Sequence, residues 1–241
     1  MVSAEARPSA RSSRSRRKRK SKRTEYTAKT LRRKQSLIKR CLPDDPGTLP
    51  KKCIDVSYWQ GNISEANWEK VKRTCGYAIC RASYTSQDSF KLHKDSTFAN
   101  NFVNAKSAGL KVGAYHYSQA ITVAEAKAEA AYICDILKNY SPTFYIVCDF
   151  EFGGRLNHRI GTKASDIANA FCDVIKARGF QPCIYANTST LNNYLKNPNY
   201  PVWVAQYASS CTYKGNKIMW QYTSSGRVDG ISGKVDLSYV Y

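Results

Sequence analysis

Two acidic residues, Asp149 and Glu151, end an apolar run and are separated by one residue. Side chains alternate along an extended strand, so both carboxyl groups point to the same side, with Cα atoms about 6–7 Å apart. Two carboxyl groups this close cannot both ionise without cost, and the usual result is a protonated acid beside a charged neighbour. That combination can break a glycosidic bond. The same spacing also occurs by chance on protein surfaces, so the surrounding elements must show whether this pair is catalytic.

Short β-rich runs alternate with helical stretches from Cys53 onward, which indicates β/α units. The predicted strands are 53–58, 77–83, 111–117, 143–150, 182–186, 202–207, 218–222 and 235–240. The predicted helices are 64–73, 96–108, 123–140, 162–178 and a shorter one at 189–195. After residue 202 the strands recur too closely for full crossover helices.

This alternation favours a parallel sheet with right-handed crossovers, and the number of strands favours closure into a barrel. A regular eightfold β/α barrel needs about 250 residues, more than residues 53–241 provide. We therefore expect an irregular α/β barrel of the TIM type, with about five β/α units followed by three further strands. An open doubly wound sheet is the alternative, but it gives no reason for so many polar strand ends.

Polar residues stand at the predicted strand ends, where parallel barrels carry their chemistry. They are Asp55, Arg81, Tyr115, Tyr117, Asp149, Glu151, Tyr185, Gln206, Gln221 and Asp236. Four carboxylates in one barrel mouth would repel each other, so their presence together indicates a function. The tyrosines offer flat faces and hydroxyl groups to sugar rings, although any one of them could simply pack the core.

Eight sequence blocks stand in the order found in glycoside hydrolase family 25, the muramidases of phage and microbial origin. They are Asp55-Val-Ser-Tyr-Trp-Gln-Gly61, Ile79-Cys-Arg-Ala-Ser83, Ala108-Gly-Leu-Lys-Val-Gly-Ala-Tyr-His-Tyr117, Asp149-Phe-Glu151, Gly179-Phe-Gln-Pro-Cys-Ile-Tyr-Ala186, Val202-Trp-Val-Ala-Gln-Tyr207, Trp220-Gln-Tyr222 and Gly230-Ile-Ser-Gly-Lys-Val-Asp236. Residues 53–241 therefore resemble this family from the first strand to the last. Phe150 stands where Val or Leu is more usual, and it should face the opposite side of the strand.

The resemblance implies hydrolysis of the β-1,4 bond between N-acetylmuramic acid and N-acetylglucosamine in peptidoglycan. It maps the acidic set of the family onto Asp55, Asp149, Glu151 and Asp236. We expect Glu151 to be the general acid, with a pKa raised towards neutrality. The remaining strand-end residues and Trp203 are the predicted substrate-binding residues.

The role of Asp149 has two interpretations. In the first, which we favour, the 2-acetamido carbonyl of the substrate attacks the anomeric carbon and Asp149 orients that amide. In the second, Asp149 or Asp236 activates water directly, and the anomeric configuration inverts. Asp55 and Asp236 otherwise hold sugar hydroxyls or keep Glu151 protonated. Arg81 pairs with an acid of the mouth, with a substrate carboxylate, or in a structural salt bridge. No metal or organic cofactor is required.

The N-terminal segment differs from the rest in charge. Residues 1–52 contain 18 Lys and Arg against 4 Asp and Glu, and residues 53–241 contain 20 against 14. The segment is too polar to bury a core, so we expect 1–52 to be a disordered tail and linker and 53–241 the catalytic domain. A basic tail suits anionic partners, namely wall polymers, lipid or nucleic acid.

Two other classes of function compete with the enzyme. One is a virion-associated or nucleic-acid-binding structural protein with a non-catalytic hydrolase-like domain, and the other is a carbohydrate-binding module. The intact acidic residues argue against both.

Composition also predicts the compartment and the assembly state. No apolar signal-peptide core and no run of about 18 apolar residues is present. Nine cysteines without a C-x-x-C pair, several of them within apolar patterns, suggest reduced thiols rather than disulfides or structural zinc. We therefore expect a monomer made in the cytoplasm, which acts on the wall after release, as endolysins do, or from the virion.

Overall fold

The computed structural model describes residues 51–157, 163–196 and 198–241. All of the predicted tail except Lys51 and Lys52 lies outside these residues. The disorder of the tail and a domain boundary at residue 53 therefore stay predictions. The first strand already includes Lys52.

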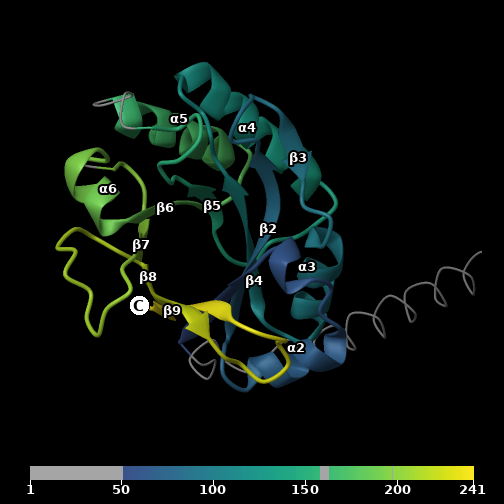
Figure 1. Cartoon of the computed structure of the whole chain (residues 1–241). Helices are drawn as coiled ribbons and strands as arrows, with labels where there is room; N and C mark the ends of the chain where they lie inside the picture. The colour runs from purple at the N-terminus through teal and green to yellow at the C-terminus, as the bar shows by residue number, and fades with distance from the viewer. Residues whose placement is uncertain (1–50, 158–162, 197) are drawn as a thin grey trace, which may run out of the picture. The chain divides into compact units, whose positions relative to one another are not determined.

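Eight strands close into a barrel, in the order β1-β2-β4-β5-β6-β7-β8-β9, with β9 pairing back to β1 (Figure 1). The barrel strands are β1 (Lys52–Val56), β2 (Tyr77–Thr85), β4 (Lys111–Tyr117), β5 (Ile146–Asp149), β6 (Pro182–Asn187), β7 (Val202–Ala205), β8 (Met219–Gly226) and β9 (Val235–Val240). All eight predicted strands are present. The sequence analysis missed β3 (Leu92–Lys94), which forms an antiparallel pair with the end of β2 outside the ring.

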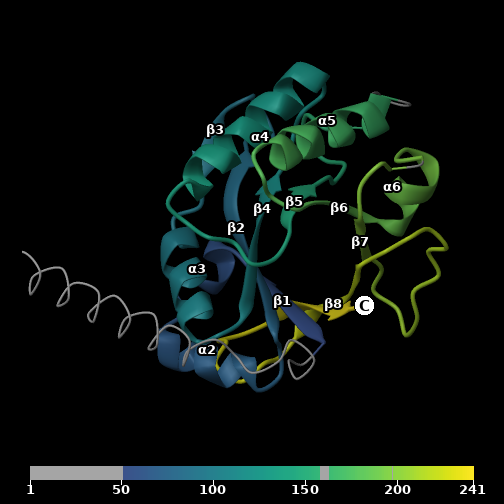
Figure 2. The same ribbon diagram turned by 180° about the vertical axis from the view of Figure 1, so that it is seen from behind.

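Helices follow the first five barrel strands in the chain, and this confirms the prediction of five β/α units and three further strands. They are α2 (Glu65–Lys72), α3 (Phe98–Ser107), α4 (Val123–Leu137), α5 (Ala164–Ala177) and the short α6 (Thr188–Asn193). Seen from both sides, α2 to α5 lie outside the ring of strands (Figures 1 and 2). None of the helices in the described residues is long and apolar enough to cross a bilayer.

The expectation of an all-parallel sheet is wrong for the last strand. β9 runs antiparallel to both of its neighbours, β8 and β1. Only residues 227–234 separate β8 from β9. A parallel crossover needs a dozen or more residues, whereas a connection this short can only reverse the chain. The start of β9, not its end, therefore lies at the same barrel mouth as the ends of the parallel strands.

The hydrophobic core has two layers, which follow the alternation of side chains along each strand. One cluster of buried residues combines alternate strand residues that point into the barrel: Cys53, Ile79, Val147, Cys183, Tyr185, Trp203, Ala205 and Met219. A larger cluster lies between the sheet and the helices and includes Trp68, Phe98, Phe102, Ile133 and Phe171. Full burial of an apolar side chain of this size contributes about 1.5–3 kcal/mol.

One glycine allows two strands to approach closely. A Cβ atom on Gly113 in β4 would stand 2.3 Å from the carbonyl oxygen of Tyr145, just before β5. The backbone of residues 143 and 144 instead bonds to the Val112 carbonyl. β5 is therefore shorter than the predicted strand 143–150.

Cysteines contribute to both core layers as thiols. The eight cysteines of the described residues are free, and all except Cys211 are buried. Burial raises the pKa of Cys75 to about 12, so this thiol stays protonated and packs as a small hydrophobic group.

Candidate active site

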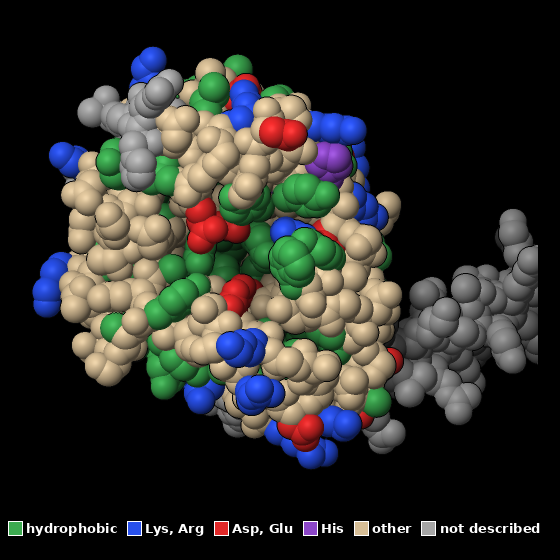
Figure 3. Space-filling model, in the orientation of Figure 1, with side chains coloured by type: hydrophobic (Ala, Val, Ile, Leu, Met, Phe, Trp, Pro, Cys, Tyr) green, Lys and Arg blue, Asp and Glu red, His purple; other side chains and the backbone are tan. Residues whose placement is uncertain are grey.

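A cavity of about 620 Å³ opens at the mouth of the barrel. Figure 3 shows it as a hollow at the centre of the molecule, with acidic and hydrophobic side chains around it. Ten of the eleven predicted site residues line it: Asp55, Arg81, Tyr115, Tyr117, Asp149, Glu151, Tyr185, Trp203, Gln221 and Asp236. Segments far apart in the sequence thus meet at one hollow.

The register of β5 places the Asp149–Glu151 pair. Asp149 is the last residue of β5 and lies between Tyr117 of β4 and Tyr185 of β6. The N–H of Phe150 donates to the Tyr185 carbonyl at 2.9 Å, so extended pairing continues one residue beyond the strand. Phe150 is fully buried in the outer core layer, on the opposite side, as expected. Both carboxyl groups therefore face the cavity.

The other two acids come from the first and last strands. Asp55 and Asp236 are direct partners across the antiparallel β1–β9 pair, so their side chains lie side by side. The two carboxyl groups share a hydrogen bond, and Gln221 Nε2 donates to Asp55 Oδ2 at 3.1 Å. The prediction that Asp236 ends its strand is wrong: it is the second residue of β9 and reaches the mouth because β9 is reversed.

All four carboxyl groups have a pKa above their ordinary values, chiefly because burial penalises the charged form. The pKa of Asp149 is raised further by Glu151 and Asp55 and is partly lowered by Arg81. The Tyr185 hydroxyl partly offsets the rise in the pKa of Glu151, and the charge of Asp236 adds to it. Burial and mutual proximity therefore favour the protonated forms of these acids more than in free carboxyl groups.

Hydrogen bonds fix the wall around these acids. Gln221 Oε1 accepts from the Tyr185 hydroxyl at 2.8 Å and from the Tyr207 hydroxyl at 3.0 Å. Trp203 packs edge-on against Tyr185, and its Nε1 donates to Ser238 Oγ at 3.0 Å. Trp203 is almost fully buried, so it forms the floor of the cavity rather than an open platform.

Arg81 has a defined environment on one side of the cavity. Its Nε donates to Asp95 Oδ2 at 2.8 Å, and its guanidinium carbon lies 4.7 Å from the ring centre of Tyr58 and 4.9 Å from that of Tyr84. One terminal nitrogen, Nη2, is buried and finds no hydrogen-bond partner in the part of the chain that the structure describes, and the same holds for Oδ1 of Asp149.

Gln206 does not line the cavity. Its amide is bound to the following loop: Oε1 accepts from the Thr212 N–H at 2.8 Å, and Nε2 donates to Thr212 Oγ1 at 2.9 Å. Inward residues alternate along β7, and Gln206 is one step out of phase with Trp203 and Ala205. The predicted contact of Gln206 with substrate is therefore not supported.

Several cavity residues were missed because they follow the strands rather than end them. Tyr58 and Trp59 lie on a short 3-10 helix (η1, Tyr58–Gln60), and their side chains are 43% and 75% exposed. The side chains of Ser57 and Gln60 form a capping box around this turn. The S-x-x-Q spacing is a sequence signal for such a turn and could have located it.

The cavity wall at β2 was also underestimated. Tyr84, Thr85, Ser86 and Gln87 line the cavity, although the predicted strand ended at residue 83. Pairing with β3 extends β2 to Thr85. Gln87 Nε2 then reaches the Tyr117 hydroxyl at 3.0 Å.

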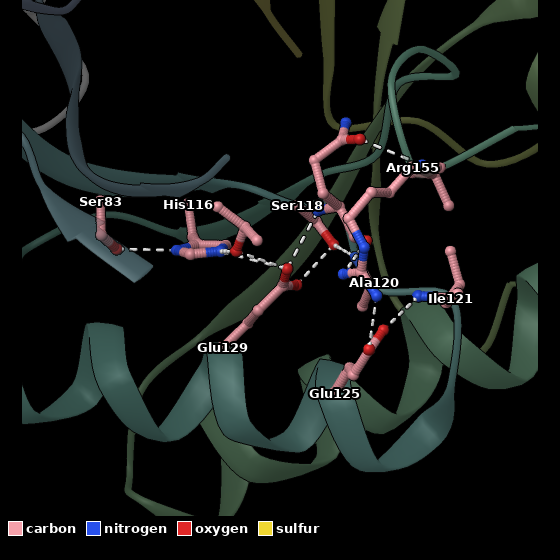
Figure 4. A network of polar contacts seen from close by, with 11 residues as sticks. Ser83, His116, Ser118, Ala120, Ile121, Glu125, Glu129 and Arg155 are labelled. Atoms are coloured by element: carbon pink, nitrogen blue, oxygen red, sulfur yellow. Dashed lines mark hydrogen bonds and ion pairs between the residues drawn. The ribbon is translucent and has the colours of Figure 1, made fainter. Parts of the chain in front are cut away.

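A buried polar network supports the mouth from behind (Figure 4). Glu129 of α4 is fully buried and accepts hydrogen bonds from Thr85 Oγ1 at 2.7 Å, from Ser118 Oγ at 2.5 Å and from the Gln119 N–H at 2.9 Å. His116 Nε2 lies 3.6 Å from the same carboxylate. The Ser118 N–H in turn donates to the Asp149 carbonyl at 3.0 Å. The network therefore joins β2 and β4 to the strand that carries the acid pair.

A second link runs to the loop after Glu151. Arg155 forms an ion pair with Glu125 of α4 at 2.7 Å, and the Leu156 N–H donates to Gln119 Oε1 at 3.0 Å. These contacts attach the loop to the first turn of α4 and to the segment between β4 and α4. Among the described residues, no group of three or more His, Cys, Asp or Glu side chains is arranged to hold a metal ion.

Comparison with known proteins identifies a family that this chain matches. The family model described as Glycosyl hydrolases family 25 matches residues 54–231. The chain is 31% identical over 191 residues to the "Autolytic lysozyme" of Clostridium acetobutylicum, which covers 77% of this chain and 54% of that protein. The chain thus spans about half the length of this curated relative.

Two solved structures have a similar fold. The bacterial lysozyme of Streptomyces coelicolor aligns with a TM-score of 0.64 and 28% identity, over 80% of this chain and 93% of that one. The modular autolysin LytC of Streptococcus pneumoniae, solved in complex with a synthetic peptidoglycan ligand, aligns with a TM-score of 0.68 and 28% identity, over 79% and 46% of the two chains. The shared region is the barrel.

Proposed function

Because this chain belongs to glycosyl hydrolases family 25, we propose that its barrel is an N-acetylmuramidase that cleaves peptidoglycan. The observation that carries the proposal is the meeting of four carboxyl groups, from β1, β5 and β9, in one cavity with raised pKa values. The names of the similar proteins, lysozyme and autolysin, support the same substrate class.

Glu151 is the proposed general acid. Burial and the charge of Asp236 raise its pKa, which favours the protonated form that must donate to the departing glycosidic oxygen. Its side chain is partly exposed within the cavity, so a substrate oxygen can approach it. The Tyr185 hydroxyl keeps that pKa from rising further.

Asp149 is proposed to act on the acetamido group of the muramic acid. Its Oδ1 is a buried acceptor to which no described residue donates, and an amide N–H would satisfy it. An oriented amide can attack the anomeric carbon through its carbonyl oxygen, and the intermediate carries a positive charge that a carboxylate at Asp149 would balance. The competing route is direct attack by water activated by Asp149 or Asp236. The anomer released first separates the two routes, because an inverted product excludes participation of the acetamido group.

The remaining acids and the aromatic wall are proposed to bind the sugar. Asp55, hydrogen-bonded to Asp236 and Gln221, holds a proton in a fixed position beside the reaction site. The other proposed substrate-binding residues are Arg81, Tyr115, Tyr117, Tyr185, Trp203 and Gln221, all of which line the cavity. Tyr58, Trp59 and Tyr207 extend this set at the rim, where exposed aromatic faces suit sugar rings.

The alternative functions are less well supported. A non-catalytic structural protein or carbohydrate-binding module has no need for four acids in one cavity, two of them buried, which cost folding free energy when charged. For residues 1–52 we propose binding to an anionic polymer, because their charge is suited to a wall polymer, lipid or nucleic acid. Action on the wall after release from a cell or from a virion, and a monomeric state, stay predictions.

Clearing of a purified peptidoglycan suspension tests the proposal. The full chain and a chain starting at Lys51 should both clear it, and Glu151→Gln should not. Clearing by Glu151→Gln at the rate of the native sequence would refute the assigned chemistry. Clearing by the full chain alone would make residues 1–50 part of the enzyme rather than an accessory.

A further inference from the structure

We propose that the Arg81 guanidinium binds a carboxylate carried by the substituent on O3 of muramic acid, and thereby selects muramoyl over glucosaminyl residues. The inference rests on the proposed function and specifies which part of the substrate is recognised. It depends on three features of Arg81: a fixed orientation, an unsatisfied donor, and its position beside Asp149.

The orientation of Arg81 is fixed by the Asp95 carboxylate, which is held in place by its own hydrogen bonds. Asp95 is almost fully buried, and its Oδ1 accepts from the N–H and the hydroxyl of Thr97 at 2.9 and 2.7 Å. Its Oδ2 accepts from the Tyr58 N–H at 3.1 Å and from Arg81 Nε at 2.8 Å. Asp95 thus holds only the Nε side of the guanidinium and leaves its other edge free.

Two aromatic rings limit the direction from which a partner can approach the other edge of the guanidinium. The rings of Tyr58 and Tyr84 both lie within 5 Å of the guanidinium carbon. Contacts of this kind stabilise a cation and hold its plane. A partner must therefore approach in the plane of the group, at the terminal nitrogens, which is the geometry in which Arg binds carboxylates through two parallel bonds.

The unsatisfied donor of Arg81 indicates that a hydrogen-bond acceptor is missing. Nη2 of Arg81 is buried and has no partner among the described residues, although a buried donor without a hydrogen bond costs about 1–3 kcal/mol. Asp95 is the one acid that lies within 4 Å of Arg81 among the described residues. Arg81 is also the one basic residue among those described that line the cavity. Arg81 is thus the one cation that the described lining of this four-acid site offers to an anionic group of the substrate.

The position of Arg81 determines which substituent of the sugar it can reach. Arg81 of β2 and Asp149 of β5 point into the same cavity on either side of β4, and the charge of Arg81 acts on Asp149. If Asp149 holds the acetamido group on C2, Arg81 stands beside the substituent on the adjacent carbon, C3. In muramic acid this substituent ends in a carboxyl group, whereas N-acetylglucosamine has a hydroxyl there.

The carboxylate has two sources. In glycan strands without peptides it is the lactyl carboxylate itself. In strands with stem peptides the lactyl group is amidated, and the nearest free carboxylate belongs to the peptide. Both present the same chemistry to Arg81, so the experiment needs ligands of each kind.

Ligand binding in a Glu151→Gln background tests the inference without turnover. The ligands are a GlcNAc–MurNAc tetrasaccharide with free lactyl carboxylates, its methyl ester, the same tetrasaccharide carrying L-Ala–D-Glu, and chitotetraose. We expect one of the two acids to bind about tenfold or more tighter than the ester, as a charged hydrogen bond implies. Preference for the lactyl acid or for the peptide acid identifies the source.

Variants at Arg81 assign the preference to this residue. Arg81→Met should bind the acid and the ester equally, with little change for chitotetraose, and Arg81→Lys should retain part of the preference. Arg178→Met removes the same charge from the exposed end of α5 and should leave every dissociation constant unchanged. Thermal unfolding monitors the fold of each variant.

Two results would overturn the inference. One is equal affinity for acids and ester with Arg81 intact. The other is a preference that survives in Arg81→Met, or an equal loss for all four ligands there, which would make Arg81 structural. Neither result affects the proposed function, which depends on hydrolysis of peptidoglycan by the native sequence.

Discussion

Asp55 and Asp236 are paired across the closing seam of the barrel, and their carboxyl groups share a hydrogen bond. Burial raises the pKa of both carboxyl groups, and the hydrogen bond between them raises the pKa of Asp55 further and lowers that of Asp236, which favours the proton on Asp55. The pairing requires β9 to run antiparallel to β1. The reversal of the last strand therefore supplies an acid to the mouth that a regular parallel barrel would place elsewhere.

Asp55→Asn should stabilise the protein at neutral pH. A carboxyl whose folded-state pKa is raised favours folding below its ordinary pKa, and this contribution is lost as the pH rises through the folded-state pKa. Asn keeps the shape, accepts from Gln221 and donates to Asp236 as protonated Asp55 does. We expect the melting temperature to rise by a few degrees at pH 7 and to change little below pH 4. Equal shifts at both pH values would contradict the assignment of the proton to Asp55.

Glu151→Gln should abolish most of the activity without changing the fold. Removal of a general acid typically lowers turnover by about 10²–10⁴-fold. Glu69→Gln, an exposed carboxyl of α2, is the matched control and should retain native activity. Release of soluble muropeptides measures turnover, and near-native release by Glu151→Gln would remove this residue from its role.

Tyr185→Phe should shift the pH dependence of the reaction. The Tyr185 hydroxyl lowers the pKa of Glu151, so its removal should raise that pKa. Activity requires protonated Glu151 and falls as the pH rises through its pKa, so the alkaline limb of kcat/KM should move to higher pH. A limb that stays in place, or moves to lower pH, would show that Tyr185 does not control this proton.

Glu129 should be the main stabilising acid behind the mouth. Burial alone would raise its pKa, but bonds from His116, Ser118 and Thr85 lower it below its ordinary value of 4.5. Glu129→Ala leaves these donors unpaired, and we expect a loss of about 3–5 kcal/mol in the free energy of unfolding. The native sequence should have a larger free energy of unfolding than Glu129→Gln above pH 4.5, and this difference should be lost as the pH falls. Urea unfolding across this range measures both effects.

Trp59 should contribute to binding but not to folding. Its side chain is 75% exposed at the cavity rim, so Trp59→Ala removes little buried surface. We expect a KM for soluble glycan fragments raised about tenfold, in line with the loss of one stacking contact, at an unchanged melting temperature. Tyr241→Ala, also exposed but outside the cavity, is the control and should leave KM unchanged.

The sequence predicted the acids of the site well because alternation and order are local properties. Asp149 and Glu151 share a side by strand geometry alone, and the outward position of Phe150 follows from the same rule. Asp236 reached the predicted mouth for a different reason, since strand direction depends on the length of the connection from β8 and on closure with β1.

Residues outside the strands were harder to predict. Gln206 looked like a strand-end amide, but β7 ends at Ala205 and the Gln206 side chain binds its own loop. Tyr58 and Trp59 lie in a turn whose position depends on Asp95, 37 residues further along the chain. The orientation of Arg81 likewise depends on this distant acid, which no local pattern indicates.

The reducing end of the products tests the central claim most directly. Purified peptidoglycan is digested with the full chain, reduced with borohydride and analysed by mass spectrometry, with Glu151→Gln as the control. Cleavage by a muramidase predicts muropeptides that end in reduced N-acetylmuramic acid, absent from the control digest. Products that end in reduced N-acetylglucosamine, cleavage only within the peptides, or no products from the native sequence would contradict the account.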